Sequence, residues 1–321
     1  MQYFDADRLE QLLDIPSTIE ALAEGFRSDW VIPARHHHDF DNPRAGKPST
    51  LLLMPAWEVG RYLGIKTIIV SPNNRRHQLP AIQGTYTLFD AERGLPLAQM
   101  DARRLTNLRT AAASALAATY LARPDARRLL MVGTGSLAPF LIAAHCAVRP
   151  IEAVSIWGRD FTKAESLARS LDNGQQTFTP VRDLPTAVSE ADLISCATLS
   201  PSPLVFGEDL RPGQHLDLVG AYRPHMREAD NEAVRRAQLF ADTRAGASTE
   251  SGDLAIPLAQ ELIQAHDIQA DLFDLCRGHH PGRRDAQHIT FFKSVGHALE
   301  DLAAAKLAYE RWRAGTVNST G

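Results

Sequence analysis

The sequence has few cysteines, no marked excess of either charge and no long apolar run. Its 321 residues include only three cysteines, which lie too far apart for a disulfide framework or a clustered zinc site. Lys and Arg number 34 against 38 Asp and Glu, so the basic surface of a nucleic-acid-binding protein is not expected. No segment approaches the ~18 apolar residues of a membrane span, and the N-terminus has no signal-peptide pattern. We therefore expect a cytoplasmic protein that binds neither nucleic acid nor membrane.

The first third of the chain has the pattern of an antiparallel α+β structure. Ser17 and Glu20 have the spacing of a capping box, which predicts a helix from about Ser17. Three β-rich runs follow and are divided by Pro, Asn and Gly; they cover residues 50–54, 62–70 and 84–89. Residues 90–94 (DAERG) predict a turn between antiparallel strands. An Ala-rich helix is predicted over residues 106–122.

From residue 127 onward, apolar strands alternate with helical stretches, the pattern of βαβ units and a parallel sheet. The predicted strands are residues 129–132, 153–157, 192–197, 215–219 and 239–242. A last amphipathic helix over 294–313 is expected to return to the first domain. The predicted fold is thus α/β: a parallel-sheet domain over residues 125–295, and a discontinuous antiparallel α+β domain over 1–124 and 296–321.

A GxGxxA element separates the predicted strand 129–132 from the helix that follows. Glycines at its first two positions allow a tight turn and close approach to a pyrophosphate, and Ala138 lets the helix lie near the sheet. The helix N-terminus adds amide donors and a favourable dipole. We predict a Rossmann-type dinucleotide site; the alternative is a turn with no ligand. The residues expected at the dinucleotide are Gly133, Thr134, Gly135, Ser136 and Leu137.

The end of the second strand of this unit carries basic residues. An Asp or Glu at this point holds the ribose of NAD, whereas an Arg suits the 2′-phosphate of NADP. Here Gly158 occupies the acidic position, and Arg159 and Lys163 are placed to face a phosphate. We predict NADP as the cofactor. NAD is the alternative, in which Arg159 is a surface charge and Asp160 binds the ribose.

Short motifs along the whole chain resemble those of the ornithine cyclodeaminase/mu-crystallin family. They are LGIK at 63–66, PNN at 72–74, LP at 79–80, Gly84, Asp101, LT at 105–106, RTAA at 109–112 and FKSVG at 292–296, followed by Glu300 and Asp301. The resemblance implies a Rossmann domain joined to an antiparallel α+β domain that binds substrate and pairs subunits into a homodimer. It also implies a nicotinamide dinucleotide bound in the cleft between the domains, and a small imino or amino acid as substrate.

By motif position, the resemblance places Arg35, Lys66 and Arg109 at the substrate carboxylate, with Lys66 nearest to the reacting carbon. Arginine can bind a carboxylate through two parallel hydrogen bonds, and the pKa of a lysine falls in a desolvated cleft. A structural salt bridge is the alternative for Lys66 and Arg109, and a solvated loop position is the alternative for Arg35. We also assign Thr198, Gly220 and Lys293 to the cofactor site.

The histidine triplet and the second cysteine are not expected to react. On a strand only His36 and His38 would share a face, and no acidic or thiol partner has suitable spacing, so we expect a solvated loop and no metal. Cys196 has no CxxC partner and no evident activating base, which predicts a small buried side chain.

One departure from the family pattern bears on the reaction. Cyclodeaminases of the family carry an aspartate in a GGDCPG segment, and here residues 219–224 read VGAYRP, with Tyr222 at the aspartate position. Because tyrosine has a reference pKa near 10, it is a poor anionic base at neutral pH. The resemblance then implies an NAD(P)H-dependent reductase of a cyclic or α-imino acid such as Δ1-pyrroline-2-carboxylate. Alternatives are an alanine-dehydrogenase-like enzyme, ornithine cyclodeaminase, and a crystallin-like protein that binds cofactor without turnover.

Overall fold

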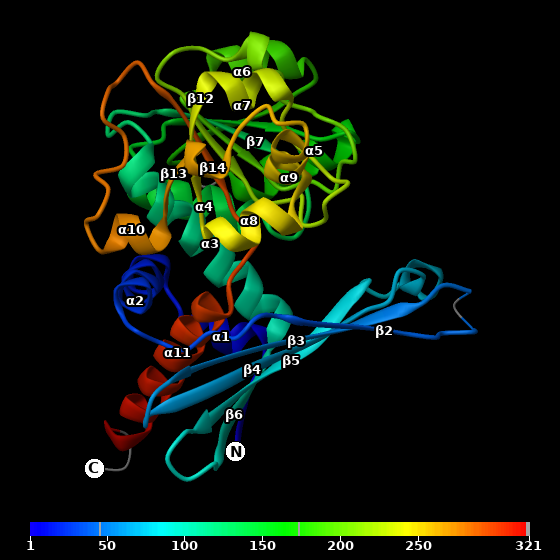
Figure 1. Cartoon of the computed structure of the whole chain (residues 1–321), viewed down its shortest axis with the longest axis vertical. Helices are drawn as coiled ribbons and strands as arrows, with labels where there is room; N and C mark the ends of the chain where they lie inside the picture. Colours follow the sequence, from blue (N-terminus) through cyan, green and yellow to red (C-terminus); the bar gives the residue numbers. More distant parts are fainter. Residues whose placement is uncertain (45, 173, 319–321) are drawn as a thin grey trace. The chain divides into compact units, whose positions relative to one another are not determined.

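The structure, a computed structural model, describes residues 1–44, 46–172 and 174–318 (Figure 1). It consists of two compact units, Met1–Arg109 with Ala298–Gly321, and Thr110–His297. The α/β fold class predicted from the sequence is confirmed. The domain boundaries predicted at residues 124 and 295 stay a prediction, since compactness alone does not define a folding domain. No helix of the described residues is long and apolar enough to cross a bilayer.

The first unit contains a six-stranded sheet in the order β1-β6-β5-β4-β3-β2. Its strands are β1 (Gln2–Phe4), β2 (His36–Phe40), β3 (Ser49–Glu58), β4 (Tyr62–Val70), β5 (Ile82–Asp90) and β6 (Pro96–Asp101). All neighbours pair antiparallel except β1 and β6. The helices of this unit are α1 (Ala6–Leu12), α2 (Ile15–Arg27), α11 (Ala298–Asn318) and the first residues of α3 (Ala102–Leu121), with a 3₁₀ turn, η1 (Asn74–His77). The three predicted β-rich runs are therefore confirmed as β3, β4 and β5.

Burial alternates along β4, and this alternation gives the sheet two different faces. Every second residue from Tyr62 to Val70 is buried, including Gly64 and Lys66. The long helix α11 packs against β3, β4 and β5, and Lys66 contacts it directly. The buried residues therefore face α11, and the intervening residues of β4 lie on the opposite face.

Two helices begin earlier than the sequence predicted. Helix α2 starts at Ile15, because the carboxylate of Asp14 accepts a hydrogen bond from the backbone N–H of Ser17 at 2.9 Å. Helix α3 starts at Ala102, because the Asp101 carboxylate accepts from the N–H of Arg104 at 2.6 Å. The helix predicted from about Ser17 is confirmed with a slightly earlier start, and the predicted start at residue 106 is wrong, because an aspartate in front of each helix caps it.

The last helix begins later than predicted. It starts at Ala298, whereas residues 294–297 belong to the second unit and have no regular secondary structure. The buried carboxylate of Asp242 accepts hydrogen bonds at 2.7 Å from the N–H groups of Val295 and Gly296, and Gly296 has a φ of +83°. This left-handed conformation cannot continue a helix.

The histidine triplet lies on a strand, so the predicted loop is wrong. Residues 36–40 form the edge strand β2, and all five are exposed. Backbone pairing with β3 makes this polar segment a strand, although its composition is not β-like. The prediction that the triplet is solvated is confirmed. Among the described residues, no group of three or more His, Cys, Asp or Glu side chains is placed to hold a metal ion.

The second unit is a parallel sheet of eight strands in the order β13-β12-β14-β11-β10-β7-β8-β9. Its strands are β7 (Arg128–Val132), β8 (Ala153–Trp157), β9 (Thr177–Val181), β10 (Leu193–Cys196), β11 (His215–Leu218), β12 (Ala237–Ala241), β13 (Ile268–Asp271) and β14 (Ile289–Lys293). The five predicted strands are confirmed as β7, β8, β10, β11 and β12. Strands β9, β13 and β14 were not predicted.

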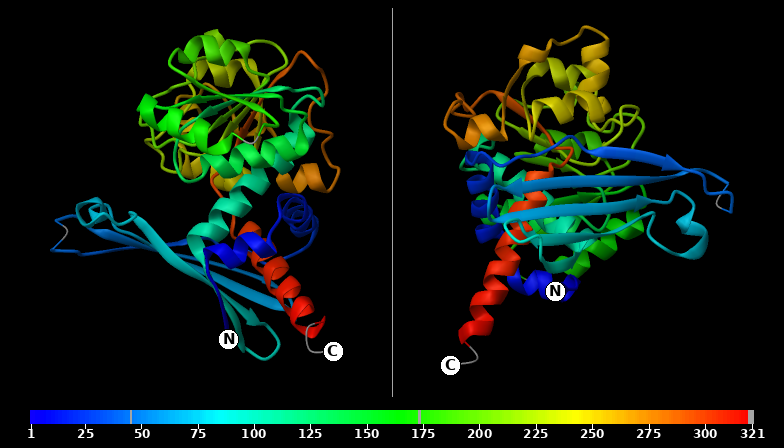
Figure 2. Two further views of the ribbon diagram at one scale, coloured as in Figure 1. Left: turned by 180° about the vertical axis from the view of Figure 1, so that it is seen from behind. Right: turned by 60° about the horizontal axis from the view of Figure 1, so that its bottom comes forward.

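Helices cover both faces of this sheet, with α4 on one side and α6 and α7 on the other (Figures 1 and 2). The helices and 3₁₀ turns of this unit, besides the rest of α3, are α4 (Ala138–Val148), α5 (Phe161–Leu171), α6 (Leu184–Glu190), η2 (Gly207–Asp209), α7 (Asn231–Arg236), α8 (Arg244–Glu250), α9 (Gly252–Ala259), η3 (Ala265–Asp267) and α10 (Leu272–Cys276). The strand order, which reverses at β7, is that of a Rossmann-type dinucleotide-binding domain.

A buried carboxylate ties α3 and α4 to the sheet. Asp217 on β11 accepts hydrogen bonds from Ser114 of α3 at 2.8 Å and from Ser195 of β10 at 2.7 Å, and it lies 3.0 Å from Nε2 of His145 on α4. Burial alone would raise the pKa of Asp217, but the hydrogen bond and charge of His145 lower it. The ionised carboxylate thus fixes α4, the helix that follows the glycine loop, against the sheet.

The close approach of β4 and β5 predicts a strong effect of one methyl group. An ideal Cβ at Gly64 would lie 1.8 Å from the hydroxyl oxygen of Tyr86 and 2.5 Å from its Cζ. Because Tyr86 is fully buried, we expect Gly64→Ala to lower the free energy of unfolding by about 1–3 kcal/mol. Chemical denaturation measures it. The control is Gly315→Ala in α11, where nothing lies within 4 Å. Equal stability of both variants would contradict the packing argument.

Candidate functional site

Lys66 lies at the centre of the first unit and is bound by a carboxylate. Its Nζ is 2.7 Å from Oδ2 of Asp301, and the two side chains are 4% and 0% exposed. Strand β4 supplies the lysine on its buried face, opposite Tyr86 of β5, and the first turn of α11 supplies the aspartate. An ammonium group is thus held inside the protein by one ion pair.

Arg109 joins the same cluster from α3. Its Nε donates to Oδ1 of Asp301 at 2.9 Å, and its Nη1 donates to Oε2 of Glu300 at 2.6 Å. Asp301 therefore bridges Lys66 and Arg109 with its two oxygens. The sequence analysis gave a structural salt bridge as the alternative to a substrate-binding role for Lys66 and Arg109, and this salt bridge is present. It balances two cations against two carboxylates and leaves the predicted role at the substrate open.

The cluster lowers the proton affinity of its lysine. The pKa of Lys66 falls from 10.5 to about 8, mainly through burial and next through the charge of Arg109, while Asp301 opposes the change. The charge of Arg35, which is half-buried just before β2, contributes in the same direction. For Asp301, burial would raise the pKa, but Arg109 and Lys66 hold it below its ordinary value.

Charge counting gives a balanced cluster. Lys66 and Arg109 supply two positive charges, and Glu300 and Asp301 supply two negative ones. The charge of Arg35 acts on Lys66 from nearby. Guanidinium groups in this position suit a ligand that carries a carboxylate.

Tyr86 is a further polar group beside the cluster that the sequence analysis missed. Its hydroxyl is buried and has no hydrogen-bond partner among the described residues. Burial, and next the charge of Asp301, raise the pKa of Tyr86 well above its ordinary value, so the phenol stays neutral. Glu300 and Asp301 were part of the motif but had no assigned role; two adjacent acids in an Ala-rich apolar helix are the signal that could have identified them.

The glycine loop of the second unit has open space where a ligand would approach. Gly133 directly follows β7 with a φ of +127°, and an ideal Cβ on it would lie 2.7 Å from the carbonyl oxygen of Ala197. Nothing lies within 4 Å of a Cβ at Gly135. Helix α4 begins directly after Leu137, whose apolar side chain cannot accept hydrogen bonds from the N–H groups of the first turn. These features fit a pyrophosphate at the start of α4.

The predicted phosphate-binding side chains lie at the surface beside this loop. Arg159 and Lys163 are both exposed. Asp160 is the N-cap of α5 and accepts from the N–H of Thr162 at 3.1 Å. A Cβ at Gly158 would lie 2.7 Å from Cγ2 of Thr134, so the end of β8 and the glycine loop are close neighbours.

The other three predicted cofactor residues gather around a glutamate that the sequence did not reveal. Glu228 accepts hydrogen bonds from the N–H of Thr198 at 2.6 Å and from that of Gly220 at 2.8 Å. Nζ of Lys293 lies 4.0 Å from Glu228 and 3.0 Å from Asp253. Lys293 is fully buried, so its ammonium group is held by internal carboxylates.

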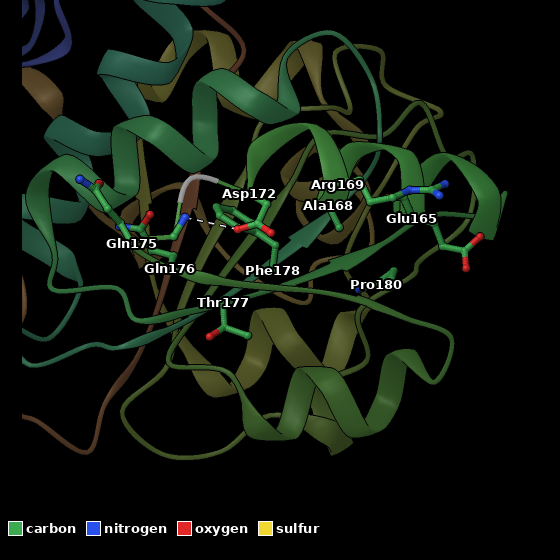
Figure 3. Close-up of a pocket in the computed structure, with 10 residues that line it drawn as sticks. Glu165, Ala168, Arg169, Asp172, Gln175, Gln176, Thr177, Phe178 and Pro180 are labelled. Carbon is green, nitrogen blue, oxygen red and sulfur yellow. Dashed lines mark hydrogen bonds between the residues drawn. The ribbon is translucent and has the colours of Figure 1, made fainter.

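A separate pocket of about 530 Å³ lies elsewhere in the second unit (Figure 3). It is lined by the second half of α5 and by the start of β9, including Arg169 and Thr177. None of the predicted site residues lines it. It adjoins the amino end of β9, whereas the glycine loop follows the carboxyl end of β7, so this pocket is not the dinucleotide site predicted here.

Cys196 is buried and unpaired, as the sequence predicted. Burial, and next the charges of Glu228 and Asp253, raise the pKa of its thiol well above the ordinary value. A protonated buried thiol is a poor nucleophile.

Comparison with known proteins identifies relatives over the whole chain. The model of the ornithine cyclodeaminase/mu-crystallin family matches residues 7–316. A Δ1-pyrroline-2-carboxylate reductase of Paracoccus denitrificans is 39% identical over 284 residues, which cover 88% of this chain and 89% of that protein.

Solved structures give the same picture. The structure of Thermococcus litoralis Δ1-pyrroline-2-carboxylate reductase in complex with NADH and L-proline has a TM-score of 0.92 and 31% identity, and the match covers 98% of each chain. An archaeal alanine dehydrogenase dimer with bound NAD has a TM-score of 0.90 and 28% identity, covering 98% of this chain and 97% of the other. With the motifs in order and the family model matched from residue 7 to residue 316, this chain belongs to the ornithine cyclodeaminase/mu-crystallin family.

Proposed function

We propose that this protein is an NAD(P)H-dependent reductase of a small cyclic or α-imino acid, with Δ1-pyrroline-2-carboxylate as the leading candidate. The observation that carries the proposal is the buried cluster of Lys66, Arg109, Glu300 and Asp301, whose lysine has a pKa of about 8. Relatives and neighbours named as reductases of this substrate support it. The substrate brings a carboxylate, which the guanidinium groups of Arg35 and Arg109 can bind.

The residues of the second unit fit a nicotinamide dinucleotide. The positive φ of Gly133, the open space at Gly135 and the start of α4 suit its pyrophosphate. When bound, the reduced nicotinamide supplies a hydride. We propose the loop residues Thr134, Ser136 and Leu137, together with Arg159 and Lys163, as the remaining contacts on this side.

In the proposed mechanism, Arg35 and Arg109 hold the substrate carboxylate, and Lys66 acts on the imine nitrogen. Its ammonium would donate a proton to that nitrogen, and the hydride needed at the C=N carbon to give the amino acid is what a bound reduced dinucleotide would supply. Asp301 keeps the ammonium form available at neutral pH and fixes its position. Lys66 then recovers a proton from solvent.

Three alternatives differ from this proposal, and the two that are reactions are distinguished by their substrates. An alanine-dehydrogenase-like reaction, with pyruvate and ammonia as substrates, is favoured by the neighbour of TM-score 0.90. Cyclodeamination is disfavoured because Tyr222, half-buried in the loop after β11, replaces the aspartate of the cyclodeaminases. A role limited to cofactor binding would give Lys66 and Arg109 no substrate to hold.

The first prediction concerns Lys66. Lys66→Met should lower the rate of imine reduction by about 10²–10⁴, the typical effect of losing a positioned acid or base. NADPH affinity should stay close to wild type, because Lys66 lies in the first unit and the glycine loop in the second. A 340 nm assay with Δ1-pyrroline-2-carboxylate measures the rate. Ornithine, the control substrate, should release no ammonia; proline formation from ornithine would contradict the reductase assignment.

The pH profile gives a second readout of the same role. Since Lys66 has a pKa of about 8, kcat/KM should decline above that pH as the donor loses its proton. Asp301→Asn removes the charge that favours the ammonium form, so the decline should move to lower pH. Glu310→Gln is the control on the same helix, where the partly exposed Glu310 pairs with Arg61. An unchanged profile in Asp301→Asn would remove Lys66 as the proton donor.

The choice of cofactor rests on Arg159. We propose NADP because Asp160, the alternative ribose ligand, is engaged as the cap of α5. Arg159→Ala should weaken NADPH and leave NADH unchanged, since only NADPH carries the 2′-phosphate. Fluorescence titration of both cofactors measures this. The control, Arg169→Ala, removes an exposed arginine at the other end of α5. Equal affinity of the wild type for both cofactors would refute the proposal.

We also propose that the protein is a homodimer. The face of the first sheet opposite α11 carries apolar residues, among them Leu63, Ile65 and Ile69 of β4, which are half-buried in a single chain. A two-fold pairing of such faces would remove them from water, and one relative is described as a dimer. Light scattering should give twice the chain mass of 35.3 kDa. Ile65→Glu should shift the mass toward one chain, and a wild-type monomer would refute the pairing.

A further inference from the structure

Glu228 makes four hydrogen bonds to two separate segments of the second unit. Its Oε1 accepts from the N–H and the hydroxyl of Thr198, at 2.6 and 2.8 Å. Its Oε2 accepts from the N–H groups of Gly220 and Ala221, at 2.8 and 3.3 Å. One oxygen therefore serves the segment after β10, and the other serves the segment after β11.

These two segments touch each other. A Cβ on Gly220 would lie 2.1 Å from both the N and the O of Thr198, so the backbones are in direct contact. Strands β10 and β11 are parallel neighbours, and both segments lie at their carboxyl ends. In a Rossmann-type sheet, β7 and β8 hold the adenosine half of a dinucleotide, and the strands beyond the reversal hold the other half. Thr198 and Gly220 thus belong to the nicotinamide end.

Glu228 is itself held in place by a second carboxylate and an ammonium group. Asp253 of α9 accepts from the N–H groups of Glu228 and Ala229, at 2.6 and 3.2 Å. Nζ of Lys293 is 3.0 Å from Asp253 and 4.0 Å from Glu228. All three charged side chains are fully buried. A buried carboxylate with one shared cation is costly, and burial raises the pKa of Glu228 to about 7, opposed by Lys293.

We propose that Glu228 is a positioning residue for the nicotinamide end of the dinucleotide. Its carboxylate holds the segments after β10 and β11 together, so that Thr198 and Gly220 present one continuous backbone surface. The inference rests on the proposed function, since it requires that the second unit binds a nicotinamide dinucleotide. Glu228 acts through these two segments and not by contact with the reacting atoms.

A carboxylate is needed at this position because both of its oxygens accept hydrogen bonds from the two segments. Glutamine keeps one accepting oxygen and replaces the other with an NH₂ group, which is a donor. In Glu228→Gln the NH₂ group would therefore lie against the N–H groups of one segment, so that donors would face donors. The volume and fold are nearly preserved, while the link between the two segments is lost.

The experiment compares two probes that differ only at the nicotinamide end. Isothermal titration measures the affinity of the full chain for NADPH and for 2′-phospho-ADP-ribose, which lacks the nicotinamide. In Glu228→Gln we expect NADPH to bind about tenfold more weakly, the equivalent of about one lost hydrogen bond. The affinity for 2′-phospho-ADP-ribose should stay within about twofold of wild type, because that probe does not reach the altered segments.

A matched control separates positioning from general destabilisation. Asp192 also accepts two backbone N–H bonds, from Arg127 and Arg128, at 2.9 Å each, but it lies at the amino end of β10. Asp192→Asn should lower the melting temperature and leave both affinities unchanged. If Glu228→Gln does not fold, Glu228→Asp keeps the charge with a shorter reach and should show the same selective loss.

Two results would overturn the inference: an equal loss of both probes, or NADPH affinity in both Glu228 variants equal to wild type. Wild-type protein that binds neither of the two probes nor NADH would refute the proposed dinucleotide site itself. If the wild type binds both probes and the Glu228 variants change the affinity for both probes equally, only the role of Glu228 is refuted. The two failures are therefore distinguishable in one set of titrations.

Discussion

The bridge that Asp301 makes between Lys66 and Arg109 is the constraint on which the first unit depends. Three elements meet at that carboxylate: β4 brings the lysine, α3 brings the arginine and α11 brings the acid. Each of these charges would be costly to bury alone, by several kcal/mol. The residues therefore need one another, although the arginine and the acid are 192 positions apart in the sequence. The return of α11 to the N-terminal sheet is what makes the cluster possible.

The second unit also buries charged side chains, but in a different ratio of carboxylates to cations. Glu228, Asp253 and Lys293 place two carboxylates around one ammonium, whereas the first cluster pairs two cations with two carboxylates. The backbone N–H groups bound by the two carboxylates supply the missing compensation. This arrangement commits backbone amides at the carboxyl ends of β10 and β11 to internal partners, and it fixes the loops there. In both clusters the buried charges lie where loops or helices are held at a defined position.

The sequence predicted the elements whose pattern is local and missed those that depend on a partner. Strand β4 was predicted with its correct bounds because it is a local run rich in β-forming residues, which Gly and Pro residues delimit on either side. Strand β2 was missed because its polar residues become a strand only by pairing with β3. Lys66 and Arg109 stood out as charges in apolar surroundings. Glu228 and Asp253 did not, because acidic residues in loops and at helix starts are ordinary, and only the folded chain shows that they are buried.

The lowered pKa of Lys66 has opposite consequences for stability and for the proposed proton donation. In the unfolded chain the group has a pKa near 10.5, and in the folded protein about 8. Between these values the folded state binds fewer protons, so stability rises with pH there, and below pH 8 the folded protein bears the full cost of a buried ammonium, on the order of 3 kcal/mol. Proton donation has the opposite dependence, because it requires the ammonium form. The proposed donor role therefore works against stability, since it uses the ammonium form that burial disfavours, and a pKa near the working pH keeps both forms of the lysine populated.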